Sequence, residues 1–170
     1  MISLVFALLL LSFASWTANG CTCMDDMPGY RSNKTYANWI CEHSMVIRAH
    51  VLVKNVSSES AGSGEILTTT PFGQFGDRIF EIRAIAVYRN VYNYSEPTTV
   101  RTPAGNGMCG QYFSEDREYL ILGGGGYSFS TTMCDHNSAW EWLSEKEKEG
   151  LESGRFAQNC RPEDLYARDG

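Results

Sequence analysis

Two long segments of the chain alternate between apolar and polar residues, with the two-residue period that is typical of half-buried antiparallel strands. They span residues 45–54 and 78–89. In the first segment the apolar face consists of Met45, Ile47, Ala49, Val51 and Val53, and the polar face of Arg48, His50 and Lys54. In the second segment we expect Phe80, Ile82, Ala84, Ala86 and Tyr88 to face the core, and Glu81, Arg83 and Arg89 to face solvent.

Three shorter strands are predicted at residues 98–102, 118–122 and 127–133. The glycines 123–126 separate the last two and predict a turn. A phosphate-binding loop would open a helix, whereas a run rich in aromatic and Thr residues follows here. Residues 55–76 are rich in Ser, Thr and Gly, so we expect a projecting loop between the two long strands.

Two helices complete the pattern. Ser144 and Glu147 have the spacing of a capping box, which predicts a solvated helix running to about Gly154, with Ser138 and Glu141 as an alternative, earlier start. A second helix is predicted at residues 36–41 and their flanks. Five short strands without a βαβ rhythm predict a mainly β protein, built as a small closed barrel with flanking helices.

The first twenty residues carry no charge, and an apolar run at residues 4–13 is followed by Ala18 and Gly20 at the spacing of a signal-peptidase site, although no basic residue precedes the run. A membrane span needs about 18–25 apolar residues, which this run does not reach. We therefore expect an exported, extracellular protein that begins at Cys21. One domain would cover residues 21–160, with a short polar tail at 161–170.

The formal net charge of -6 argues against binding to nucleic acid or to an anionic membrane. Export favours oxidised cysteines, so the even number of cysteines predicts three disulfides. A zinc site is the alternative, disfavoured because no CxxC pair occurs, and spacing alone does not choose the pairing. Three glycosylation sequons begin at Asn33, Asn55 and Asn93.

No catalytic motif is recognisable in the sequence. The chain contains three histidines, His43, His50 and His136, but no HExxH, GxSxG or glycine-rich nucleotide motif. Extending the first strand backwards places His43 and His50 on opposite faces, so a shared metal is disfavoured and we expect exposed polar side chains. With the cysteines assigned to disulfides, no nucleophile has an evident base. We therefore expect a protein that is not an enzyme.

Removal of the leader would leave Cys21-Thr22-Cys23 at the amino terminus, with Cys41 and Val46-Ile47-Arg48-Ala49 following. This order resembles the inhibitory amino-terminal domain of the tissue inhibitors of metalloproteinases. The likeness continues to Cys160 through the following short motifs: Phe80-Glu81-Ile82-Arg83 with Tyr88, Cys109-Gly110 with Tyr112-Phe113, Glu118-Tyr119-Leu120-Ile121, Thr131-Thr132-Met133-Cys134, and Ala139-Trp140. The resemblance implies a five-stranded OB-type Greek-key barrel with disulfides Cys21–Cys109, Cys23–Cys134 and Cys41–Cys160.

The resemblance also implies a function. A monomer would inhibit matrix or adamalysin-type zinc metalloproteinases and need no cofactor of its own, with the α-amine and carbonyl oxygen of Cys21 binding the zinc of the protease. Thr22 would enter the primary side-chain pocket of the protease. The remaining contacts would come from Cys23 and Met24 and from Asn106, Gly107 and Met108, which precede Cys109.

Two departures from the family pattern predict weak or selective inhibition. Met24-Asp25-Asp26 stands where an apolar, proline-containing stretch is typical, and Asn106-Gly107 replaces a more acidic and hydroxylic pair. The alternative hypothesis is a netrin-like binding module that engages a receptor, matrix component or immune-cell partner without inhibiting a protease.

Overall fold

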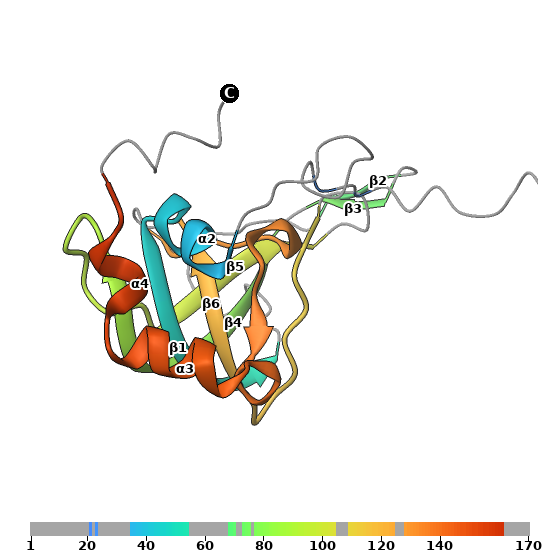
Figure 1. Cartoon of the computed structure of the whole chain (residues 1–170). Helices are drawn as coiled ribbons and strands as arrows, with labels where there is room; N and C mark the ends of the chain where they lie inside the picture. The colour runs from blue at the N-terminus through green and yellow to red at the C-terminus, as the bar shows by residue number, and fades with distance from the viewer. Residues whose placement is uncertain are drawn as a thin grey trace, which may run out of the picture.

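The computed structural model describes residues 21, 23, 35–54, 68–70, 73–75, 77–104, 109–124 and 128–161. Its main sheet has five antiparallel strands in the order β5-β4-β1-β6-β7 (Figure 1). The strands are β1 (Met45–Lys54), β4 (Asp77–Asn90), β5 (Thr99–Pro103), β6 (Glu118–Gly123) and β7 (Ser138–Ala139). The fold is therefore mainly β, as expected.

The predicted strand at 127–133 is wrong for the part of it that the structure describes. Ser130 forms only isolated bridges, with Arg101 and Gly124, and the fifth strand of the sheet is β7 instead. Consequently the regular strands form an open sheet and not the closed barrel that we expected. Residues 129–131 instead bridge β5 and the end of β6. Arg101 of β5 exchanges backbone hydrogen bonds of 2.9 Å with Phe129 and Thr131, and Gly124, which follows β6, exchanges bonds of 3.0 and 3.1 Å with Ser130.

The alternation predicted for β1 is confirmed by burial. Met45, Ile47, Ala49 and Val51 lie in one core cluster, together with Phe80 and Ile82 of β4 and with side chains from β5, β6 and the loops. Val46 is buried as well, on the opposite face of β1. The sheet therefore carries a hydrophobic cluster on each face.

The alternation of burial predicted along β4 is confirmed, but the face that Ala86 and Tyr88 occupy is not the predicted one. The register steps from Val46↔Arg89 to Ile47↔Val87 and later from Arg48↔Ala86 to Ala49↔Ala84, so β4 has extra residues at two bulges. An extra residue exchanges the two faces of a strand. Ala86 therefore pairs with Arg48 on the polar face, and Tyr88 packs against the second cluster and not beside Phe80.

Arg89 also departs from its predicted exposure to solvent. Its side chain is half-buried and donates hydrogen bonds to the carbonyl oxygens of His43, at 2.8 Å, and Cys41, at 3.3 Å. These bonds attach the end of β4 to the carboxyl-terminal end of the helix α2 (Tyr36–Glu42), where Cys41 and His43 lie.

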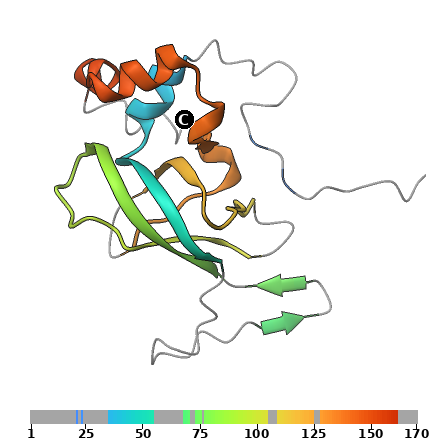
Figure 2. The ribbon, with the colours of Figure 1, turned by 90° about the horizontal axis from the view of Figure 1, so that it is seen from below.

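The segment between the two long strands contains more structure than the predicted loop. Its described residues form a hairpin of β2 (Thr68–Thr70) and β3 (Gly73–Phe75), with Thr68 opposite Phe75. Figure 2 shows this hairpin on the opposite side of the sheet from the helices. The segment therefore projects, as expected, but the prediction that it lacks secondary structure is wrong.

Three helices lie together on one side of the sheet (Figure 2): α2 (Tyr36–Glu42), α3 (Glu145–Glu152) and α4 (Arg155–Gln158). They cover the second cluster, whose buried members are Ile40, Val46, Leu120, Leu122, Leu143 and Leu151. Within the described residues, no helix combines the length and apolar character that a membrane span requires.

Both predicted helices are confirmed. The capping box of α3 is present, because the Ser144 backbone N–H donates to Glu147 Oε2 at 2.7 Å and the Ser144 hydroxyl accepts from the Glu147 N–H. The alternative start at Ser138 is wrong, because β7 begins there and the 3-10 helix η3 (Trp140–Trp142) follows.

Candidate functional site

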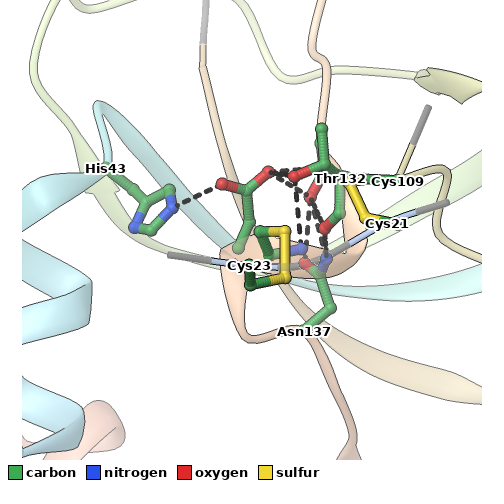
Figure 3. The surroundings of a disulfide bond; sticks show 9 residues. Cys21, Cys23, His43, Cys109, Thr132 and Asn137 are labelled. Carbon is green, nitrogen blue, oxygen red and sulfur yellow. Dashed lines mark hydrogen bonds and ion pairs between the residues drawn. A yellow bond between two sulfur atoms is a disulfide. The ribbon is translucent and has the colours of Figure 1, made fainter. Parts of the chain in front are cut away.

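Two disulfides lie next to each other at the start of the described chain (Figure 3). Cys21 is bridged to Cys109 and Cys23 to Cys134, with Cα–Cα distances of 5.2 and 5.4 Å. A third bridge joins Cys41 to Cys160, at 5.0 Å. These are the pairs that the resemblance implies. Residues 21 and 23 are thereby each attached to a segment that lies far along the sequence.

The cysteine zinc site considered as an alternative is excluded. The sulfur atoms of Cys21, Cys109 and Cys134 lie within 4.8 Å of one another, which is close enough to suggest a metal site. All six cysteines are engaged in disulfides, however, and none is free. Because the thiolate is the form that binds zinc, the oxidised sulfurs hold the chain together and do not bind a metal.

Both bridges meet at one short turn, the 3-10 helix η2 (Met133–Asp135). Cys134 belongs to this turn and is bridged to Cys23. The backbone N–H of Met133 donates a hydrogen bond of 2.8 Å to the carbonyl oxygen of Cys109, which is bridged to Cys21. The position of η2 therefore sets the position of residues 21 and 23. We call η2, together with the Cys21–Cys109 and Cys23–Cys134 bridges, the ridge.

Asp135 closes the η2 turn. Its Oδ2 atom accepts hydrogen bonds from the backbone N–H of Thr132, at 2.5 Å, and from the Thr132 hydroxyl, at 2.9 Å. The Thr132 hydroxyl in turn accepts from the backbone N–H of Cys134 at 3.3 Å. A capping box thus satisfies backbone donors that the short helix leaves without a partner.

Two polar side chains attach this turn to β6. The Asn137 Oδ1 atom accepts from the backbone N–H of Leu122 at 2.9 Å, and its amide nitrogen donates to the carbonyl oxygen of Thr132 at 2.8 Å. The Thr131 hydroxyl donates to the carbonyl oxygen of Leu122 at 2.6 Å. The ridge is therefore supported from the sheet by hydrogen bonds in a largely buried setting.

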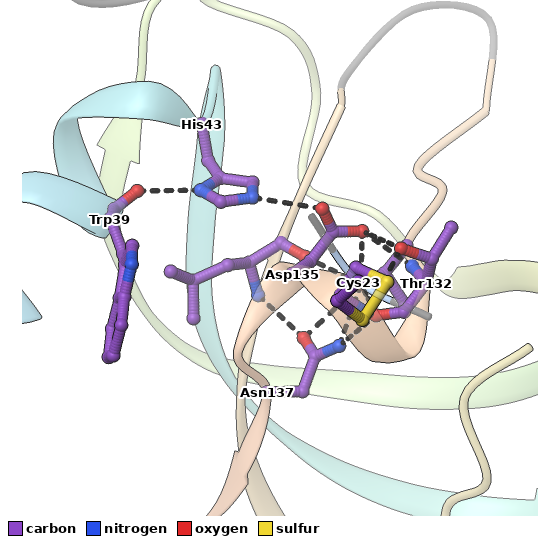
Figure 4. A network of polar contacts seen from close by, with 9 residues as sticks. Cys23, Trp39, His43, Thr132, Asp135 and Asn137 are labelled. Carbon is purple, nitrogen blue, oxygen red and sulfur yellow. Dashed lines mark hydrogen bonds and ion pairs between the residues drawn. A yellow bond between two sulfur atoms is a disulfide. The ribbon is translucent and has the colours of Figure 1, made fainter. Parts of the chain in front are cut away.

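His43 attaches the same turn to α2, contrary to the expectation that the histidines are exposed. Its side chain is only 4% exposed, with Nε2 lying 3.1 Å from Asp135 Oδ1 and Nδ1 lying 2.6 Å from the carbonyl oxygen of Trp39 (Figure 4). Asp135 is buried too, at 3% exposure. A buried polar group is costly unless it is hydrogen-bonded, and this arrangement satisfies both partners.

The other two histidines are half-buried and not exposed. His136 stacks on the Trp39 ring with 3.7 Å between ring centroids, and His50 Nε2 lies 3.7 Å from Asp116 Oδ1. In the described part of the chain, none of the three histidines belongs to a group of three or more potential metal ligands.

The tyrosines with shifted pKa values, Tyr36 of α2 and Tyr88 of β4, pack against the second hydrophobic cluster and not at the ridge. Burial raises the pKa of Tyr36, and the carboxylate of Glu147 raises it further. Burial also raises the pKa of Tyr88, against the opposing effect of Arg48. Both phenols therefore stay protonated and neutral at physiological pH, which suits their position in the second hydrophobic cluster.

Of the predicted protease-binding residues, the structure describes Cys21 and Cys23, each held by its disulfide. The other predicted binding residues, Thr22, Met24, Asn106, Gly107 and Met108, lie outside the described residues, as do the sequons at Asn33 and Asn55. Asn93 is exposed, in the connection between β4 and β5.

The residues that support the ridge were not identified from the sequence. They are His43, Thr132, Asp135 and Asn137. Thr132 and Asp135 have the spacing of a capping box, which is the signal that would have predicted a turn there in place of a strand. His43 and Asp135 are 92 residues apart in the chain, and no local pattern connects them.

A comparison with protein families gives a match that covers most of this chain. The family described as "Tissue inhibitor of metalloproteinase" matches residues 19–163, which is most of the sequence and includes all six cysteines.

Proposed function

The chain belongs to the tissue inhibitor of metalloproteinase family, and from this premise we propose that it blocks zinc metalloproteinases with the α-amine and carbonyl oxygen of Cys21. Membership indicates an inhibitor with metalloproteinases as partners, and not an enzyme. The observation that carries the proposed mechanism is the double anchoring of residues 21 and 23 to one turn.

The chemistry of zinc fits a free amino terminus. A catalytic zinc keeps one coordination position open for water or substrate. An α-amine and the carbonyl oxygen of the same residue form a five-membered chelate at such a metal. The amine must lose its proton first, which is easy near neutrality because its reference pKa is about 7.7–8.0. Inhibition should consequently weaken as the medium is acidified.

Rigid anchoring adds to the affinity. A flexible terminus would lose conformational entropy on entering the cleft of a protease, whereas a terminus held by two disulfides has lost most of that freedom already. The bridge from Cys21 to Cys109 also joins the residue before Thr22 to the residue after Met108. We propose that both flanking segments enter the cleft, with Thr22 in the primary pocket and Asn106, Gly107 and Met108 beside it.

The proposed site of action is extracellular. Removal of residues 1–20 would produce the free amine at Cys21, and secretion fits the family and the three disulfides, which form and persist in oxidising compartments. The partners that we propose are matrix or adamalysin-type metalloproteinases.

The decisive experiment compares the refolded chain beginning at Cys21 with the same chain carrying one additional alanine in front. Both are titrated against catalytic domains of matrix and adamalysin-type proteases. We expect inhibition by the first chain only, because the extra residue removes the amine from the chelate. Matching circular dichroism spectra would control for folding. Equal inhibition by both chains would rule out the chelate, and inhibition by neither would favour the netrin-like binding module.

A second variant tests the role of Thr22. Thr22→Gly is expected to weaken binding to deep-pocketed proteases by about 1–3 kcal/mol, as the loss of a small buried group would. An unchanged inhibition constant would show that Thr22 does not occupy the pocket.

A further inference from the structure

We propose that His43 and Asp135 are positioning residues for inhibition: the buried pair fixes the η2 turn and, through it, the residues that present Cys21. The inference deepens the proposed function and rests on it for its effect on a protease. Its structural part, that the pair immobilises the ridge, stands on the described contacts alone.

The contact between His43 and Asp135 is a hydrogen bond, whichever of the two groups carries the hydrogen. The carbonyl oxygen of Trp39 only accepts hydrogen bonds, so Nδ1 of His43 carries a hydrogen toward it. Nε2 faces a carboxyl oxygen of Asp135, and a hydrogen must lie between these two atoms as well. Either an imidazolium faces a carboxylate or a neutral ring faces a protonated carboxyl. In both cases the contact is directional and, at this depth of burial, shielded from water.

The two ends of this link have different roles. On the His43 side lie α2, whose Cys41 is bridged to Cys160, and Arg89 of β4, which donates to the carbonyl oxygen of His43. This end is fixed to the body of the protein. On the other side, Asp135 closes η2, and η2 holds Cys23 covalently and Cys109 by a hydrogen bond.

The remaining attachments of η2 do not replace this link. Asn137 and Thr131 connect the turn to Leu122 of β6, which lies next to β1 in the sheet. They hold the turn from the sheet, and His136, which caps η2, stacks on the Trp39 ring of α2. Among the described contacts, the His43–Asp135 pair is the hydrogen-bonded link between η2 and the end of α2. Loss of the pair should therefore loosen the ridge locally and leave the sheet folded.

Two substitutions at one position separate geometry from charge. Asp135→Ala removes both the contact with His43 and the closure of η2. Asp135→Asn has nearly the same shape: its oxygen accepts from the Thr132 N–H, and its amide nitrogen donates to Nε2 of a neutral His43. Asp116→Asn is a matched control, because Asp116 also faces a histidine but its side chain is 92% exposed.

Amide hydrogen exchange provides a readout that needs no protease. We expect faster exchange at Cys23 and Cys134 in Asp135→Ala, unchanged protection in β1 and α3, and recovery in Asp135→Asn. Wild-type exchange at Cys23 in Asp135→Ala would overturn the proposal. A uniform loss of protection through the whole sheet would overturn it too, since the pair would then serve general stability. If Asp135→Ala does not fold, His43→Ala gives the same comparison, because it removes the contact with Asp135 and leaves the closure of η2 by Asp135 in place.

Inhibition is measured on the same variants. Asp135→Ala should raise the inhibition constant by about tenfold to a hundredfold, the effect of misplacing a reacting group by about 1 Å. Asp135→Asn and Asp116→Asn should stay within about threefold of the wild type, a change worth well under 1.4 kcal/mol. Inhibition by Asp135→Ala at wild-type strength would overturn the positioning role. If the wild type itself does not inhibit, the proposed function fails while the exchange result still decides whether the pair immobilises the ridge.

Discussion

The backbone N–H of Met133 donates a hydrogen bond of 2.8 Å to the carbonyl oxygen of Cys109. Met133 is followed by Cys134, so one short turn joins the partner of Cys23 to the partner of Cys21. The third bridge, Cys41–Cys160, joins the helices instead. The disulfides therefore divide into two at the ridge and one in the body of the protein.

This division predicts different effects for removing different bridges. The double variant Cys23→Ser with Cys134→Ser should weaken inhibition strongly, because the terminus loses one of its two anchors. The bridges close loops of 111 and 119 residues, so on the loop-entropy model each contributes about 4–5 kcal/mol before strain is subtracted. Thermal unfolding and inhibition are measured together.

The matched control is Cys41→Ser with Cys160→Ser. It should lower the midpoint of thermal unfolding by a similar amount and, at temperatures where the chain remains folded, leave inhibition nearly intact. Equal loss of inhibition in both double variants would contradict a special role for the ridge.

Gly110 provides a second prediction. A methyl group built on its Cα would lie 1.8 Å from the carbonyl oxygen of Pro103, closer than real atoms approach, so Gly110→Ala must displace backbone next to Cys109. We expect a loss of about 1–3 kcal/mol in the free energy of unfolding and weaker inhibition. Gly124→Ala is the control, because its nearest atom is the Ser130 hydroxyl at 3.9 Å. A fully stable Gly110→Ala variant would contradict this close approach.

The local patterns in the sequence predicted where strands and helices lie better than they predicted which side of the sheet each residue faces. Alternation identified β1 and β4, and the capping box identified α3, because these signals depend on neighbouring residues. The bulges in β4 leave no such signal, since the extra residues are defined only by pairing with β1. For that reason the sequence misplaced Ala86 and Tyr88.

The site shows the same limit. The cysteines and their pairing could be anticipated from a family pattern, whereas the burial of His43 depends on an Asp residue that the chain brings near only when folded. The Thr132–Asp135 box was visible in the sequence, but the Thr and aromatic residues before it favoured a strand by propensity. No regular strand forms at the described residues there, because β7 is the strand that pairs with β6.

Arg48 provides a third prediction, about stability alone. Its Nε and Nη2 atoms donate to Glu118 Oε2 at 2.9 and 2.6 Å, and its guanidinium lies 4.1 Å from the centroid of the Trp140 ring. Arg48→Ala should lower the free energy of unfolding by about 1–3 kcal/mol. Arg83→Ala, at an exposed position of β4, should change it by no more than about 0.5 kcal/mol. Chemical denaturation measures both values, and equal effects would show that the Arg48 contacts contribute little.

Asn93 leads to the last prediction, that this sequon carries a glycan in the secreted protein. The Asn90 side chain closes the turn by donating to the carbonyl oxygen of Tyr94 at 2.8 Å and accepting from its N–H at 3.0 Å. Asn93 stands exposed in this turn with φ of 54°, and Ser95 is exposed as well. The acceptor amide and the sequon hydroxyl are thus both accessible to a glycosyltransferase.

Mass spectrometry before and after treatment with a peptide N-glycosidase tests this prediction on protein secreted from eukaryotic cells. The sequon requires a hydroxyl at position 95. Ser95→Ala should therefore abolish the glycan at Asn93, and Ser95→Thr should retain it, although both variants change the same exposed side chain. Because the two substitutions differ in the hydroxyl, absence of the glycan from Asn93 in both variants would point to damage to the turn. An unmodified Asn93 in the wild type would refute the prediction directly.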